Sequence, residues 1–524
     1  MTSPIQVLWY AALSMYRMIA AYLLSLVFSL VIGIWAARSK TAEKMIIPVL
    51  DIMQSVPILG FFPVALIFFM NVLGPVLGGE LSSIFLIFTS QVWNMTFGVY
   101  ESVKMIPKDV EEMARFYGID GWLRLIKITI PSTYLKLSYN SALSWSSGWF
   151  FLYASEIISV GGAEVKLPGL GSYLAMALTS SPPRVWDAVV ATATILALVV
   201  LTHLFVWEPL INISASKVGE ISEKPRTLIF LRRLALLGLE KIEESDFLEN
   251  LTERLNSLMT KIYPSLVKWS KVAVIVVILL SIALSLKRAP PLKLSYLLSS
   301  EYMKNPQLLM IGTMNSLRRV FLALIISLAW TLPVAILTQR SKHRENFLLL
   351  FELVAAFPIP VLWPFLVKYI ILPLGKQGFE LAALTLILFG SQFYLLFNMV
   401  AGARSIPPEI DEMRKIFGIK GFLGLRKIIL PSMFSSMVTG LITAWGGAWN
   451  TTIMAEYINI GGRIYPTDVN QYGLGTLLSL AAWQFGDMGS LLIVLAVMVL
   501  LIVVFNKTLW RALYNYSSRF RFEG

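Results

Sequence analysis

The sequence contains no cysteine among its 524 residues, which excludes a disulfide framework and thiolate chemistry. Charged residues are also scarce: they make up 14% of the chain, against about 25% in typical soluble domains. The mean hydropathy is correspondingly high, at +0.71. Such a chain has few groups to place in water, and its composition excludes an ordinary soluble domain.

Short catalytic motifs are missing as well. The chain has no Gly-x4-Gly-Lys-Ser/Thr phosphate loop and no Gly-x-Ser-x-Gly sequence, and its two histidines have no companions at metal-ligand spacing. We therefore expect no catalytic residues, no cofactor and no metal. The N-terminus lacks the basic region and cleavage site of a secretory signal peptide, so we expect residues 18–37 to be a retained membrane span.

Apolar runs of membrane-spanning length are abundant. Crossing a hydrocarbon core takes about 20 mostly apolar residues, and 56% of this chain is hydrophobic. The predicted spans lie near residues 18–37, 56–76, 82–103, 136–158 and 187–207, and near 319–338, 355–375, 381–402, 434–457 and 487–506. The sequence therefore predicts an all-α polytopic membrane protein.

The two sets of spans repeat each other at an offset of 300 to 304 residues. The matched positions include Ser14 and Arg17 with Ser316 and Arg319, Trp145 and Trp149 with Trp445 and Trp449, Glu156 with Glu456, and Gly169-Leu-Gly171 with Gly473-Leu-Gly475. Five spans leave the chain on the opposite side of the membrane. A shorter apolar run, residues 272–286, must then cross as well if the halves are to share one orientation. We predict two parallel homologous five-helix repeats plus one linking span, about eleven transmembrane helices.

The most distinctive repeat is a polar loop. The first copy contains Glu112, Ala114, Gly118 and Pro131, and the second contains Glu412, Arg414, Gly418 and Pro431. Acidic residues favour a helix start, and a glycine suits the left-handed residue after a helix end. Each copy predicts a helix-turn-helix whose second helix stops before the proline. For a single copy an ordinary structured loop is the alternative, but two copies with equal spacing favour a functional surface.

The net charge of +13 does not require a nucleic-acid partner, because lysine and arginine gather in the cytoplasmic loops of membrane proteins. Arg38 and Arg340 follow equivalent spans, and the tail after residue 506 is also basic. We expect this side, with both polar loops and the C-terminus, to be cytoplasmic. The N-terminus would lie outside a plasma membrane that the chain crosses several times.

At the polar loops the chain resembles the inner-membrane permease subunits of binding-protein-dependent ABC transporters. Their hallmark, the EAA loop, reads Glu-Ala-Ala, three residues, Gly, nine residues, Ile-x-Leu-Pro. Both copies keep the Glu, the Gly and the final Pro, whereas Met113, Met413 and Arg414 depart from it. Val56-Pro57-Ile58 and the sequence from Trp149 to Gly171 look most like the nitrate/sulfonate/taurine branch. The resemblance covers nearly all of both halves.

The resemblance implies a tandem fusion of two permease domains. They are expected at 1–207 and 289–510, with a cytoplasmic connector at 208–267, the linking span at 268–288 and a cytoplasmic tail at 511–524. It also implies two cytoplasmic ABC ATPase subunits, which hydrolyse the ATP, and an extracytoplasmic solute-binding protein that delivers a small solute, for example an anion such as nitrate, sulfonate or taurine. In the family the loop docks on the ATPase. The implied coupling residues are Glu112, Ala114, Gly118, Pro131, Glu412, Arg414, Gly418 and Pro431.

The candidate residues for the translocation path are Trp145, Trp149, Glu156, Trp445, Trp449 and Glu456. The tryptophans recur at i, i+4 and share a helix face, where they either pack or line a pore. Ionisable groups in spans are often functional, yet each glutamate could also cap a helix or pair with an arginine. Three further alternatives stay open. Arg414 could make the loops inequivalent, the connector could be a tether or a docking element, and the protein could be an ion-driven secondary transporter.

Overall fold

The computed structural model describes residues 3–160, 163–180, 184–217, 300–340, 347, 350–351, 354–355, 357, 359–404, 416–419, 421–460 and 463–517. Most of the predicted connector, the whole linking span 268–288, and the loop residues Glu412 and Arg414 lie outside these residues. Every helix, strand and contact described for the protein lies within these residues.

The first half is a series of helices with one short hairpin. Its elements are α1 (Pro4–Arg38), α2 (Lys40–Ser55), α3 (Ile58–Leu73), α4 (Pro75–Lys104), α5 (Lys108–Phe116), α6 (Gly121–Arg124), η1 (Leu125–Thr129), α7 (Ile130–Glu156), β1 (Ile157–Val160), β2 (Ala163–Lys166), α8 (Leu170–Thr179), α9 (Val185–Thr202), η2 (His203–Trp207) and α10 (Glu208–Lys217). Strands β1 and β2 pair antiparallel. The elements η1 and η2 are π-helical turns.

The second half repeats this order. Its elements are α14 (Glu301–Lys304), α15 (Pro306–Arg340), η3 (Ile359–Leu362), α17 (Trp363–Leu366), η4 (Val367–Ile371), α18 (Leu372–Arg404), α20 (Gly421–Gly424), η5 (Leu425–Ile429), α21 (Leu430–Ala455), β3 (Ile458–Ile460), β4 (Arg463–Tyr465), η6 (Val469–Gln471), α22 (Leu474–Ser479), η7 (Leu480–Phe485), α23 (Met488–Phe505), η8 (Asn506–Trp510) and α24 (Arg511–Ser517). The all-helical, duplicated fold class is confirmed.

Seven helical stretches in the described residues are long and apolar enough to cross a membrane: Pro4–Arg38, Pro75–Lys104, Val185–Ser214, Pro306–Thr338, Trp363–Val400, Leu425–Ala455 and Met488–Ser517. They match the predicted spans near 18–37, 82–103, 187–207, 319–338, 381–402, 434–457 and 487–506. The span expected near 56–76 is the shorter apolar helix α3. The sequence-based prediction missed two further short apolar stretches, α8 and α22 with η7.

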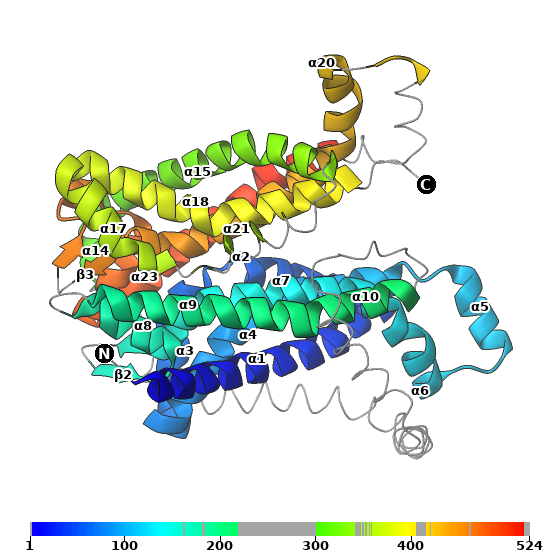
Figure 1. Ribbon diagram of the computed structural model, residues 1–524, viewed down its shortest axis with the longest axis horizontal. Helices are drawn as coiled ribbons and strands as arrows, with labels where there is room; N and C mark the ends of the chain where they lie inside the picture. Colours follow the sequence, from blue (N-terminus) through cyan, green and yellow to red (C-terminus); the bar gives the residue numbers. More distant parts are fainter. Residues whose placement is uncertain are drawn as a thin grey trace.

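Figure 1 shows the two halves side by side, with their long helices running along the longest axis of the molecule. The start of α1 lies at one end, together with α8, β2, β3 and α14. Helices α5 and α6 lie at the opposite ends of the long helices of the first half, and α20 projects from the corresponding ends of the long helices of the second half. The described parts of the two polar loops therefore project from equivalent ends of the two halves.

Small residues let the helices of each half approach closely. On α1, Ser29 bonds to Thr96 of α4 at 3.0 Å, and a Cβ on Gly33 would lie 2.8 Å from the side chain of Val99. In membranes such close approach replaces the hydrophobic driving force that drives helix association in water. It explains why the buried positions of α1 after Met18 are all alanine, serine or glycine.

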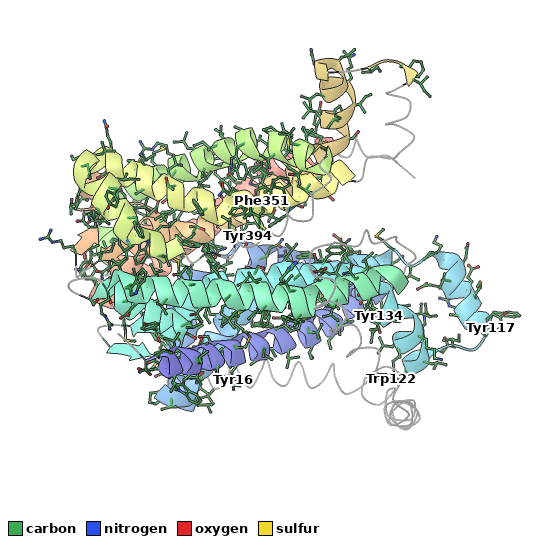
Figure 2. The ribbon with its side chains drawn as sticks, in the orientation of Figure 1. Tyr16, Tyr117, Trp122, Tyr134, Phe351 and Tyr394 are labelled. Carbon is green, nitrogen blue, oxygen red and sulfur yellow. The ribbon has the colours of Figure 1, made fainter. Side chains whose placement is uncertain are left out.

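The halves also touch each other directly. The backbone N–H of Ile58 at the start of α3 donates to the Asn450 side-chain oxygen on α21, 2.5 Å away. The hydroxyls of Ser147 on α7 and Tyr394 on α18 lie 3.5 Å apart. In Figure 2 Tyr394 lies on the face of the second half that looks toward the first. Polar groups of both halves thus connect the two repeats.

Two neighbouring glycines on α21 test how closely α18 and α21 pack within the second half. A Cβ on Gly447 would lie 2.8 Å from the Gly390 carbonyl oxygen, whereas a Cβ on Gly446 would meet nothing within 4 Å. We expect Gly447→Ala to cost about 1–3 kcal/mol of stability through overpacking. Gly446→Ala should be neutral or stabilise by up to about 1 kcal/mol through helix propensity. Thermal unfolding of the detergent-purified variants measures both, and equal midpoints would contradict the packing of α18 on α21.

Candidate functional site

A buried arginine joins three helices of the first half. Arg17 on α1 donates through Nη1 to Glu156 at the end of α7, 2.8 Å away. Its Nε and Nη2 bind the two carboxylate oxygens of Glu80 on α4, at 2.8 and 2.6 Å. Both Arg17 and Glu156 are almost fully buried. The planar guanidinium suits this forked geometry, so one cation fixes α1, α4 and α7 together.

The same cluster holds the short helix α8. The Glu156 carboxylate accepts the N–H of Gly171 at 2.7 Å and the hydroxyl of Ser14 at 2.6 Å. The Ser14 oxygen in turn accepts the N–H of Leu170 at 2.9 Å. A carboxylate is favoured at a helix N-terminus, where free N–H groups carry partial positive charge. A Cβ on Gly169 would lie 2.2 Å from the Glu156 oxygens, so only glycine lets the carboxylate come this close.

The second half builds the same cluster from equivalent residues. Arg319 donates to Glu456 at 2.9 Å and binds Glu380 through Nη2 at 2.5 Å and Nε at 3.1 Å. Glu456 accepts the hydroxyl of Ser316 and the N–H of Gly475. The sequence repeat identified the arginine, the serine, the central glutamate and the glycines of each cluster. It did not identify Glu80 and Glu380. The signal was available, because these two glutamates are also 300 residues apart.

The four repeated tryptophans are buried inside their own halves. The rings of Trp145 and Trp149 meet edge to face, with centroids 6.3 Å apart. Trp145 also packs on Trp207 and donates its indole N–H to Thr202. In the second half the ring of Trp445 packs on the rings of Trp449, Phe505 and Trp510. They join α7 to η2 and α21 to η8, and their place in a translocation path stays a prediction.

The first polar loop ends its helix on a left-handed glycine, as expected. Gly118 has φ +67°, and its counterpart Gly418 has φ +63°. The N–H of Ile119 donates to the Ala114 carbonyl at 2.8 Å, and that of Gly118 to the Arg115 carbonyl at 3.1 Å. This pair of bonds is the Schellman arrangement. Ala114 is buried, whereas Glu112 is exposed.

Glu111, next to the predicted Glu112, ties this loop to the membrane helices. Its carboxylate pairs with Arg38 at the end of α1 and with Arg124 on α6. The i, i+4 spacing of Glu111 and Arg115 alone would indicate a pair within α5, but in the described residues the ion pairs of Glu111 connect it to α1 and α6. Pro107 is the residue before α5.

A second polar contact joins α2 to α4 at the same end. Glu43 accepts a hydrogen bond from Lys104 at 2.7 Å and from the Tyr100 hydroxyl at 2.5 Å. Both bonds favour the charged carboxylate, and they hold the pKa of Glu43 below its usual value.

The helix after each glycine does not stop before the proline, contrary to the sequence-based expectation. Helix α6 continues through the π-helical turn η1 into α7, with Pro131 in its first turn. The second half repeats this at η5 and Pro431. Proline removes one helical N–H and its ring clashes with a carbonyl one turn back. A π turn widens the helix at that point, so the chain enters the membrane as one continuous helix.

These features define a class: a helical membrane protein with two parallel repeats, each carrying the same buried ion cluster and the same polar loop. The model of the family described as "Binding-protein-dependent transport system inner membrane component" matches residues 29–212 and 309–513. The chain belongs to this family and carries its domain twice. It is therefore a multi-pass membrane permease of the ABC transport class, and the tandem fusion is confirmed.

Individual relatives agree with this assignment. The chain is 25% identical over 150 residues to the nitrate import permease protein NrtB of Synechococcus elongatus, which is 29% of this chain and 51% of that protein. It is 28% identical over 161 residues to the glycine betaine transport system permease protein OpuAB of Bacillus subtilis, 31% and 52% of the two chains. For the bicarbonate transport system permease protein CmpB of Synechococcus elongatus the identity is 22% over 166 residues, 32% and 55%. The chain spans about half the length of these relatives.

The ion clusters predict a stability loss when their central carboxylate is neutralised. Glu156→Gln and Glu456→Gln should each cost about 3 kcal/mol, the lower end for breaking a buried pair, because Glu80 or Glu380 still compensates the arginine. Glu101→Gln is the control, since Glu101 pairs with Lys136 at an exposed position and should change stability by less than about 1 kcal/mol. Thermal unfolding in detergent measures all three. The structural role would be wrong if Glu156→Gln lowered the midpoint no more than Glu101→Gln.

Proposed function

We propose that the protein is the fused permease of an ABC importer. Its two polar loops bind two cytoplasmic ATPase subunits, and its two halves form the path of a small solute. The observation that carries this proposal is the placement of α5, α6 and α20 at equivalent ends of the two halves, away from the start of α1. One pair of partner subunits could then engage both loops from the same side of the membrane.

The tips of the loops have the character of a docking surface. Phe116 and Tyr117 are 85% and 73% exposed, and the matching Ile416 and Phe417 are 79% and 69% exposed. Figure 2 shows Tyr117 at the outer tip of α5, far from the helices of both halves. Large apolar side chains at such a tip are typical anchors for a groove on a partner. Glu112, Ala114, Gly118 and Pro131, with Glu412, Arg414, Gly418 and Pro431, are the proposed coupling residues.

A solute-binding protein would then deliver its solute at the opposite end, beside α8, β2, β3 and α14. The relatives are named as permeases for nitrate import, bicarbonate transport and glycine betaine transport, and we propose a small solute of this kind, such as an anion. Arg17 and Arg319 already bind two carboxylates each. We therefore propose that Glu156 and Glu456 hold α8 and α22 in place. The solute path is then assigned to the polar contacts between the two halves.

ATP hydrolysis is assigned to the partner subunits, since the chain has no phosphate-binding loop. Alternating access would follow when the ATPases draw the two loops together and the halves rock against each other. Uptake into proteoliposomes that needs ATP and the ATPase subunits supports this importer. Uptake driven by an ion gradient in the absence of the ATPase subunits would contradict the importer function.

The left-handed glycines give a specific test of docking. Gly118→Val and Gly418→Val place a β-branched residue where φ is positive, at a cost of about 1–3 kcal/mol of local strain, although nothing lies within 4 Å of either added Cβ. We expect each variant to retain less ATPase subunit on co-purification. Gly118→Asn is the matched control, because asparagine tolerates this conformation. Full ATPase binding by the valine variants would contradict the assigned docking role.

A further inference from the structure

A closed ring of polar contacts joins the first loop to the body of the protein. Arg38, the last residue of α1, donates to Glu111 on α5 at 3.1 Å and to the Thr129 hydroxyl on η1 at 2.7 Å. Arg124 on α6 pairs with the same Glu111 oxygen at 2.8 Å, and its backbone carbonyl accepts the Thr129 hydroxyl. Four elements, α1, α5, α6 and η1, thus meet around one carboxylate.

These groups are more shielded than an ordinary surface ion pair. The side chains of Arg124, Arg38 and Glu111 are 16%, 29% and 30% exposed. A single exposed ion pair contributes little, but several charges that share one geometry can hold a segment in place. The ring therefore restrains the loop independently of the continuous helix from α6 to α7.

The second half cannot build this ring. The two halves can be aligned here because Pro131 and Pro431 follow matching π turns. In this alignment Gly424 corresponds to Arg124, and Ile429 corresponds to Thr129. Glycine has no side chain to offer, and isoleucine has no hydrogen-bonding group. Two of the four partners are absent by residue type alone, so the arrangement of residues 405–415 does not affect this conclusion.

The geometry points to a mechanical difference between the two loops: Arg38, Glu111, Arg124 and Thr129 are positioning residues that make the first loop a rigid arm of α1, and the second loop lacks two of these four groups, the counterparts of Arg124 and Thr129. The consequence for transport rests on the proposed docking of ATPase subunits. A movement of the first loop tip would reach α1 directly. In the part of the chain that the structure describes, the second tip is connected to its half through α20, η5 and α21.

Spin labelling of the full-length chain in lipid nanodiscs tests the rigid arm without any partner. The sequence has no cysteine, so Tyr117→Cys and Phe417→Cys each give a single site. The two sites match, because both side chains are exposed and each precedes a left-handed glycine. We expect the label at 117 to be less mobile than the label at 417. Equal mobility at the two sites would overturn the inference.

Substitutions in the ring sharpen this test. Glu111→Gln and Arg124→Gly, which copies the second half, should raise the mobility of the label at 117 toward that at 417. Arg124→Lys should preserve the restraint, since it keeps the charge. Glu112→Gln is the control for mobility alone, because this neighbouring carboxylate is exposed. Unchanged mobility in Arg124→Gly would show that the ring does not hold the loop.

A second measurement addresses coupling in the complex with ATPase subunits and binding protein. Phosphate release from ATP is measured with and without the binding protein. We expect Arg124→Gly to reduce the stimulation ratio by about fivefold, the lower end of typical coupling between sites, and Arg124→Lys to restore it. An assembled complex with an unchanged ratio would refute the coupling role. Failure of the unsubstituted chain to bind ATPase subunits would instead refute the proposed docking and leave the spin-label result standing.

Discussion

A negative charge that is buried in a membrane protein must be compensated where it lies, and each half of this chain meets that requirement with one arginine. Arg17 and Arg319 each bind two carboxylates that come from different helices. The remaining hydrogen-bonding capacity of Glu156 and Glu456 is filled by a serine hydroxyl and by N–H groups at a helix start. Since an unpaired buried charge costs several kcal/mol, these helices are held in one relative arrangement. The short helices α8 and α22 take their position from the same carboxylates.

The rest of each half follows from this fixed end. Helices α1 and α4 run from the cluster toward the polar loop, with Ser29, Gly33 and Thr96 along their contact. At the far end Arg38 closes α1 onto the loop of the first half. Helix α1 (Pro4–Arg38) is therefore restrained by Arg17 inside its first half and by Arg38 at its last residue, and it connects the side that would face a binding protein with the side that would face an ATPase. This gives the proposed mechanism a continuous physical path through one helix.

Much of this architecture could be predicted from the sequence, because residues that form one cluster recur together in both halves. Ser14, Arg17, Glu156 and Gly169 recur at offsets of 300 to 304 residues, and the structure brings them into one cluster. The conformation of Gly118 followed from its place after an acidic helix start. Contacts between different elements were harder to predict where no repeated sequence pattern marks them. Glu111 looked like a helix-surface residue, because the i, i+4 spacing to Arg115 is a local signal and the approach of Arg38 and Arg124 is not. The proline at 131 indicated a helix end, whereas a π turn accommodates it.

The tandem fusion explains how the two halves could diverge at their loops. Two separate identical subunits would assemble as a symmetric pair, and any change in the loop would appear in both copies. In a fused chain every molecule contains one first half and one second half, so a substitution in one loop affects one contact only. Gly424 in place of Arg124, Ile429 in place of Thr129 and Arg414 in place of Ala114 all lie in or beside the loop. Each half meanwhile keeps its ion cluster, since the burial of Glu156 and Glu456 imposes the same electrostatic cost on both. The two loops therefore differ at these positions, whereas both halves keep the ion cluster.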